Sequence, residues 1–244
     1  RTVLVERCGY LGGLLTACLG ELVLWENDEH GRQAVAGVWQ ETKERLVALD
    51  ASPGTLRFDG PMYGPHVKLP LSATVTPFDP EMLKYVMAEQ VLEAGVDLLL
   101  HATVVGVVQD ENRARGVIVE GKSGRAAVLG KVTVDATGDV DVCYAAGVPV
   151  QKGRESDGRM MGSSLHINGH GIQYRPLWDY VQTHPEDVPR WASLVPVEGG
   201  CIPPYFDMMR FACHGFQVSM QAAKARGELY FTQGELGIWP RMGG

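Results

Sequence analysis

The stretch that decides the fold is VTVDATGD, which spans residues 132–139. A short apolar strand pattern leads directly into small side chains, and the stretch ends at Asp139. Small side chains allow a ligand to lie against the carboxyl end of a strand, which is where open α/β sheets bind ligands. A simpler interpretation makes Asp139 only the N-cap of a helix over residues 140–146. Either interpretation predicts an α/β fold around this stretch.

A second apolar strand pattern, TVLVE, occupies residues 2–6 and ends in an acid. In dinucleotide-binding folds, an acid at the end of the second strand accepts hydrogen bonds from ribose hydroxyls, about 20 residues after a GxGxxG fingerprint. Only five residues precede Glu6, so such a fingerprint is not in this sequence. A solvent-exposed strand end is the alternative explanation for Glu6. Because the chain opens in a strand at Thr2 and stops in a turn-like PRMGG at residues 240–244, we expect both ends to be truncated.

Two adjacent glycines follow in GYLGGLLT, residues 9–16. Glycine places no side chain between the backbone and a ligand, so the N–H groups of Gly12 and Gly13 can approach a phosphate or a flavin closely. An ordinary turn is the competing interpretation, because glycine is common in turns.

The rest of the sequence predicts alternating helices and strands. The clearest helix has Asp79 as its N-cap, Pro80 in its first turn and Gly95 at its end. Helical spacing or helix-forming composition is also found over residues 14–24, 32–49, 140–146 and 216–226, and strand patterns over residues 96–108, 116–120, 126–129 and 131–135. Residues 52–80 are rich in proline and glycine, which predicts short strands and turns.

Composition excludes several classes of partner. The chain has 244 residues and a formal net charge of −7, and it shows no basic stripe, so we expect no nucleic-acid partner. It contains no apolar run of about 18 residues, so we expect no membrane span. The cysteines are odd in number and widely spaced, which disfavours a disulfide framework and a zinc site. Their pattern favours reduced thiols in a cytoplasmic protein. They are Cys8, Cys18, Cys143, Cys201 and Cys213.

One histidine pair has the spacing of metal ligands on a helix. His166 and His170 would share a helical face, but the intervening and following Asn168, Gly169 and Gly171 disfavour a helix there. Two ligands are also fewer than a metal needs. We therefore expect no metal site.

Taken in order, these motifs resemble the FAD-dependent oxidoreductases of the glutathione-reductase-like flavoprotein class. The resemblance rests on GGLLT at residues 12–16, ATGD at 136–139, GRE at 153–155 and KARGE at 224–228. It implies an α/β fold with a three-layer FAD/NAD(P)-binding (Rossmann-like) domain over residues 1–150. A β-rich cap or substrate domain would occupy residues 151–244. The family's first strand, its fingerprint helix and its C-terminal return to the flavin are not in the sequence, so the fold is expected to be incomplete at both ends.

The resemblance assigns five positions to the adenosine end of FAD. Glu6 would bind the adenosine ribose, with Arg7 beside the adenosine. Val105 would pair its backbone with the adenine edge. Thr137 and Gly138 would form the floor beneath the adenosine.

Four further positions complete the implied cofactor site. Gly12 and Gly13 would approach the pyrophosphate and the ribityl chain, and Thr16 would lie near the flavin. Asp139 closes the ATGD strand end and belongs to the same site.

The function implied is transfer of a hydride or an electron pair between a small-molecule substrate and FAD. No side chain is assigned as a catalytic acid or base, and the 244 residues alone are expected to be inactive. A nicotinamide-dependent dehydrogenase is one alternative, because Glu6 would also suit the ribose of NAD. A non-catalytic fragment, or a subunit completed by another chain, is the other. A homo-oligomer or a second subunit is left open as a partner.

Overall fold

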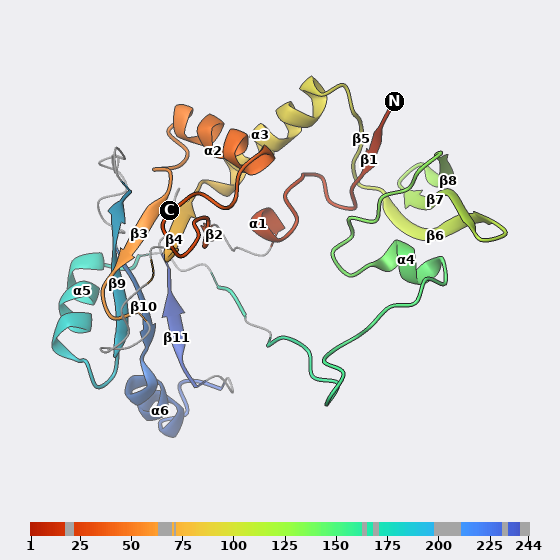
Figure 1. Cartoon of the computed structure of the whole chain (residues 1–244). Coiled ribbons are helices and arrows are strands. Elements are labelled where there is room, and N and C mark those ends of the chain that lie inside the picture. The colour runs from red at the N-terminus through yellow and green to blue at the C-terminus, as the bar shows by residue number, and fades with distance from the viewer. Residues whose placement is uncertain are drawn as a thin grey trace. The chain divides into compact units, whose positions relative to one another are not determined.

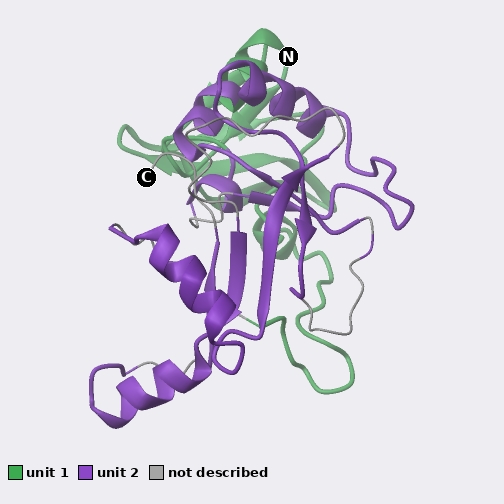
Figure 2. Cartoon of the chain, turned by 90° about the vertical axis from the view of Figure 1, so that its left-hand side faces the viewer, with its two compact units in different colours: residues 1–11, 87–165 green, residues 12–86, 166–244 purple. Residues whose placement is uncertain are grey.

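The computed structural model describes residues 1–17, 22–62, 70, 72–162, 165–167, 171–197, 211–230 and 234–239. The chain divides into two compact units, which Figure 2 colours separately. Unit 1 comprises Arg1–Leu11 and Met87–Leu165, and unit 2 comprises Gly12–Val86 and His166–Gly244. Each unit therefore combines two segments that lie far apart in the sequence.

Unit 1 contains a parallel strand pair and an antiparallel meander (Figure 1). The pair is formed by β1 (Val3–Val5) and β5 (Asp97–Leu99). The meander is formed by β6 (Thr103–Asp110), β7 (Arg113–Gly121) and β8 (Gly124–Leu129). These strands confirm the ones predicted over residues 2–6, 96–108, 116–120 and 126–129.

The core of unit 1 joins both sheets to the helix α4 (Asp141–Ala145). Val117 and Val119 lie two residues apart on β7, so their side chains point to the same face. They pack in a buried cluster with Ala102 and with Val142 of α4, and Val5 of β1 packs against that cluster. The end of β1 and the start of α4 are therefore both attached to the meander.

The strand predicted over residues 131–135 is wrong. No strand is assigned there, and the residues Val132 and Val134 are 80% and 81% exposed. A strand needs a hydrogen-bonded neighbour as well as an apolar pattern, and no strand among the described residues pairs with this segment.

Unit 2 is built on a six-stranded antiparallel sheet in the order β11-β10-β9-β3-β4-β2. Its strands are β2 (Leu22–Leu24), β3 (Leu56–Asp59), β4 (Thr74–Pro77), β9 (Arg190–Pro196), β10 (Phe211–Gly215) and β11 (Leu236–Ile238). Its helices are α1 (Leu14–Ala17), α2 (Val38–Ala48), α5 (Tyr174–Thr183) and α6 (Gln217–Ala225), and α3 (Pro80–Glu93) runs from unit 2 into unit 1.

Both faces of this sheet are packed. Successive side chains of a strand point to opposite faces. On β10, Phe211 and Cys213 accordingly pack in a cluster with Val181 of α5, which Figure 1 shows beside β9. Ala212, between them, packs on the other side with Phe58 of β3 and its neighbours. The short strands predicted within residues 52–80 correspond to β3 and β4.

The helix expected over residues 14–24 is correct only at its beginning. α1 runs from Leu14 to Ala17, residues 18–21 lie outside the described part, and Leu22–Leu24 is the strand β2. Leu22 lies opposite Pro77 in an antiparallel pair with β4. Tertiary pairing has thus overridden helical propensity.

Four other helix predictions hold, one of them with a corrected start. α4 lies within residues 140–146. α2 begins at Val38 and not near residue 32, because Gln33 pairs with Asn27 in a β-bridge and Gly37 has a positive φ of 64°. α3 is capped as predicted, with Asp79 Oδ1 accepting hydrogen bonds from the N–H groups of Glu81 (2.8 Å) and Met82 (3.2 Å). α6 lies within the range expected for it.

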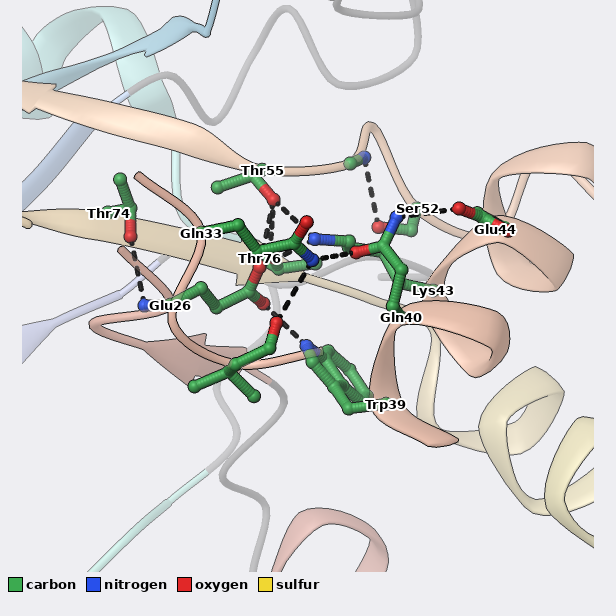
Figure 3. A network of polar contacts seen from close by, with 12 residues as sticks. Glu26, Gln33, Trp39, Gln40, Lys43, Glu44, Ser52, Thr55, Thr74 and Thr76 are labelled. Carbon is green, nitrogen blue, oxygen red and sulfur yellow. Dashed lines mark hydrogen bonds and ion pairs between the residues drawn. The ribbon is translucent and has the colours of Figure 1, made fainter. Parts of the chain in front are cut away.

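A buried polar network ties α2 to the sheet of unit 2, and Figure 3 shows it. Glu26 is fully buried, and its Oε2 accepts hydrogen bonds from Lys43 Nζ (2.7 Å) and Thr55 Oγ1 (2.9 Å). Trp39 Nε1 donates to Oε1 (2.7 Å), and the Glu26 N–H donates to Thr74 Oγ1 (3.1 Å). The carboxylate is therefore paired with a cation and hydrogen-bonded at both oxygens, as a buried charge requires.

Candidate functional site

The first part of the site lies at the carboxyl ends of β1 and β5. Because the two strands are parallel, both chains leave the sheet at the same edge. Backbone hydrogen bonds continue past the strands, from Glu6 N to Leu99 O (2.9 Å), from Ala102 N to Glu6 O (3.0 Å) and from His101 N to Cys8 O (3.1 Å). The two exits are therefore held side by side at the edge where parallel sheets bind ligands.

The carboxylate of Glu6 is positioned by the turn that follows it. The N–H of Cys8 donates to Glu6 Oε1 at 2.7 Å, so the side chain folds over the chain exit. Glu6 is partly buried, while Arg7 is exposed. An oriented acid at a strand end is the arrangement that accepts hydrogen bonds from ribose hydroxyls.

Val105 is the extra residue of a β-bulge in β6. Val104 lies opposite Val119 and Gly106 lies opposite Ile118, so Val105 has no counterpart in the β6–β7 register. Val105 as a whole residue is 50% exposed. Bulges occur often beside active sites, because the unpaired residue presents its backbone outside the ladder. The contact of Val105 with the adenine edge stays a prediction.

The loop over residues 135–141 is organised by Asp135, a residue absent from the predicted site. Its Oδ1 accepts hydrogen bonds from the N–H (3.0 Å) and the hydroxyl (2.8 Å) of Thr137, and its Oδ2 accepts one from the Cys143 N–H (2.8 Å). The Thr137 hydroxyl oxygen accepts a hydrogen bond from Asp141 N at 2.9 Å. The N-terminus of α4 is therefore held by Asp135 and Thr137, which corrects the expectation that Asp139 caps it.

The charge of Asp135 follows from these contacts. Desolvation is the largest single influence and raises its pKa, but the hydrogen bonds from Cys143 and Thr137 together outweigh it and lower the pKa from 3.8 to about 2. The carboxylate is thus ionised at neutral pH. The sequence signal that could have identified Asp135 is an acid directly before small loop residues.

The loop carries two residues in the left-handed region. Gly138 has φ 89°, and a Cβ built on it would meet nothing within 4 Å, so this position is open. Val140 has φ 56°, which is strained for a β-branched residue. Asp139 is exposed between them. Strained backbone of this kind clusters at functional sites, which is consistent with a ligand-binding role for the loop.

Six predicted positions thus belong to unit 1, and the remaining three belong to unit 2. Gly12 has φ 111°, and a Cβ there would lie 2.5 Å from Thr16 Cγ2. Gly13 has φ 50°, and a Cβ there would meet nothing within 4 Å. Its carbonyl oxygen accepts a hydrogen bond from Ala17 N at 2.8 Å, within the single turn of α1. Gly12 therefore has a packing reason to be glycine, whereas Gly13 is open.

In the described part of the chain, the cysteines and histidines form neither a reactive thiol site nor a metal site. A hydrogen bond to Asp135 raises the pKa of Cys143, and burial raises the pKa of Cys213 to about 12, so neither is poised as a thiolate. Cys8 is also a free thiol, while Cys18, Cys201 and His170 lie outside the described residues. Among the residues searched, no group of three metal-ligating side chains occurs. In the same residues, no helix has the length and apolar character needed to cross a membrane.

Comparison with known proteins gives one family. The family model of the FAD dependent oxidoreductases matches residues 1–238. No curated protein matches the chain. The family match identifies FAD as the cofactor, in preference to the nicotinamide that Glu6 alone would also have allowed. The chain belongs to the FAD-dependent oxidoreductase family.

Proposed function

We propose that the protein transfers a hydride or an electron pair between a small-molecule substrate and FAD, and that unit 1 binds the adenosine end of the cofactor. The observation that carries the proposal is the placement of Glu6 at the edge where β1 and β5 both end, with its carboxylate oriented by the Cys8 N–H. Bound FAD supplies the redox chemistry through its isoalloxazine ring. The side chains of this chain bind and orient it.

The residues present in unit 1 fit an adenosine group. Glu6 offers a carboxylate acceptor for ribose hydroxyls, and Val105 offers backbone groups outside the β-ladder for the adenine edge. Gly138 leaves open space in the loop that Asp135 and Thr137 hold. An acceptor, a backbone edge and a small-residue floor are the elements that adenosine recognition requires. We propose that Arg7 and Asp139, both exposed, lie at the margin of this site.

We further propose that the sheet of unit 1 takes another parallel strand along the free edge of β1, as in a three-layer Rossmann-like domain. Among the described strands, β1 pairs only with β5. Val132 and Val134 form an apolar pattern that is almost fully exposed, although buried partners are usual for such residues. A strand followed by a GxGxxG helix would cover them and provide an N-terminal dipole for the pyrophosphate.

The single pairing of β1 among the described strands and the exposure of Val132 and Val134 support a second candidate for the 244 residues taken alone, namely a non-catalytic fragment or a subunit completed by another chain. The roles of Gly12, Gly13 and Thr16 at the pyrophosphate, ribityl chain and flavin remain predictions. So do the domain boundary at residue 150, the glutathione-reductase-like subclass, the cytoplasmic location and any oligomer.

Purification of the native gene product tests the proposal. We expect a yellow protein with flavin absorbance that bleaches when a small-molecule donor is added without oxygen and recovers when an acceptor is supplied. A colourless protein that does not take up FAD on titration would contradict it. Reduction by NADH alone, without bound flavin, would restore the dehydrogenase alternative.

A further inference from the structure

His101 lies in the connection between β5 and β6, directly beside the exit of β1. Its N–H donates to Cys8 O at 3.1 Å, so its backbone is fixed to the turn that follows Glu6. Its φ is 53°, a left-handed conformation that is uncommon for a residue other than glycine. Such conformations persist where surrounding structure holds them, and they cluster at ligand-binding sites.

The imidazole of His101 lies against the backbone of Gly9. A Cβ built on Gly9 would be 2.6 Å from both Cε1 and Nε2 of the ring, a separation that real contacts do not show. Gly9 therefore provides the space that the ring occupies. The residue as a whole is exposed, so one side of the ring lies on the turn while other parts remain accessible to a ligand.

Glu6 and His101 are therefore both attached to the turn over residues 6–9, Glu6 as its first residue and His101 through a hydrogen bond to Cys8. The Cys8 N–H orients the Glu6 carboxylate, and the Cys8 carbonyl holds the His101 backbone. Cys8 thus links an acceptor for ribose hydroxyls to an aromatic ring with two nitrogen atoms. An imidazole can hydrogen-bond a hydroxyl through either nitrogen and can also pack against a purine.

We propose that His101 is a further residue of the cofactor site, and that its imidazole contacts the adenosine portion of FAD next to Glu6. This inference rests on the proposed function. The turn over residues 6–9 holds both the Glu6 carboxylate and the His101 ring, so the ring forms a side wall of the adenosine subsite. Gly9 is a positioning residue, because its missing side chain lets the ring lie in that place.

The test compares His101→Ala and Gly9→Ala with the unchanged native gene product. Affinities for FAD, for ADP and for FMN are measured by calorimetry, and thermal melting reports the fold. We expect both variants to bind FAD and ADP about tenfold more weakly, which is the loss of roughly one hydrogen bond. FMN has no adenosine, so its affinity should not change. His30→Ala, which removes another exposed histidine from unit 2, should change none of the three affinities.

The His101→Phe variant separates a ligand contact from a space-filling role. Phenylalanine keeps a ring on Gly9 but offers no nitrogen atom. We expect His101→Phe to bind FAD and ADP about as weakly as His101→Ala does, because it lacks the nitrogen that donates or accepts the hydrogen bond. If His101 only fills space on Gly9, His101→Phe will keep the native affinities for FAD and ADP, and the inference is wrong. If the native gene product itself binds neither FAD nor ADP, the proposed function fails, and this inference fails with it.

Discussion

Lys43 Nζ lies 2.7 Å from Glu26 Oε2, and both side chains are buried between α2 and the sheet of unit 2. The carboxylate is fully buried and the Lys43 side chain is 10% exposed. Removing one member of such a pair leaves an uncompensated charge in a poorly solvated position, which is costly, whereas removing both can be nearly neutral.

Substitution of Lys43 tests this pair. We expect Lys43→Met to lower the free energy of unfolding by about 3–5 kcal/mol, because Glu26 would remain buried without its cation. The double variant Glu26→Gln with Lys43→Met should recover part of the loss. Arg32→Met, which removes an exposed ion pair with Asp28, should cost under about 1 kcal/mol in the same denaturant titration. If Lys43→Met and Arg32→Met lower the free energy of unfolding equally, the buried pair contributes no more to stability than the exposed one.

Glu6 is expected to contribute directly to FAD affinity. Charge-assisted hydrogen bonds to ribose hydroxyls contribute roughly 1.5–3 kcal/mol each before losses due to context. In the native gene product, Glu6→Ala should therefore weaken FAD binding substantially while the melting temperature stays close to the native value. Glu29→Ala provides an exposed acid as a control. An unchanged FAD titration for Glu6→Ala would remove Glu6 from the site.

Gly13 allows a backbone strain effect to be separated from a cofactor effect. Its φ is 50°, and a Cβ there meets no protein atom within 4 Å, so Gly13→Val is strained but not blocked by the protein itself. Gly95 has φ 69° and is equally open. We expect Gly13→Val and Gly95→Val to lose similar stability in thermal melting, but only Gly13→Val to release flavin. Full flavin occupancy in soluble Gly13→Val would favour an ordinary turn.

Asp135 should make stability depend on pH in the acid range. Its pKa is about 2 in the folded protein, below its ordinary 3.8, so the folded state favours the ionised form. The resulting stability is present above the unfolded pKa and is lost as the pH falls from about 4 through about 2. Asp135→Asn should be less stable at neutral pH and should lose this part of the acid dependence. Denaturant titrations at several pH values measure it, and an unaltered acid profile in Asp135→Asn would contradict the assignment.

The open edge of β1 predicts weak cofactor binding by residues 1–244 alone. Contacts at the adenosine end must offset several kcal/mol of lost translational and rotational freedom, and none of the described helices begins with a GxGxxG segment that could hold the pyrophosphate. We expect weak or undetectable FAD binding in calorimetry and no turnover. Fusion of a strand–GxGxxG–helix segment ahead of Thr2 should recover part of the affinity. Tight FAD binding by the 244 residues would show that the sheet needs no further strand.

The sequence predicted those features that local chemistry determines. Asp79 and Pro80 gave the start of α3, and the strand ending at Glu6 could be recognised from its apolar run and its acid. Features that depend on distant partners were missed. Leu22–Leu24 is a strand because β4 pairs with it, and Val132–Val134 is not one because no described strand does. Asp135 was missed because its function arises from bonds to Thr137 and Cys143 that only the folded loop creates.

The interleaving of the two units has a consequence for synthesis on the ribosome. The chain passes from one unit to the other at residues 11/12, 86/87 and 165/166. Arg57 of β3 pairs with Val195 of β9, so the middle of the unit 2 sheet cannot close until most of the chain has been translated. Until then β3 and β4 form a nascent sheet. Its edge has unpaired backbone N–H and C=O groups beside exposed apolar side chains, a state prone to aggregation and to chaperone capture. Translation pauses before residue 190 should therefore lower the yield of soluble protein more than pauses after residue 215.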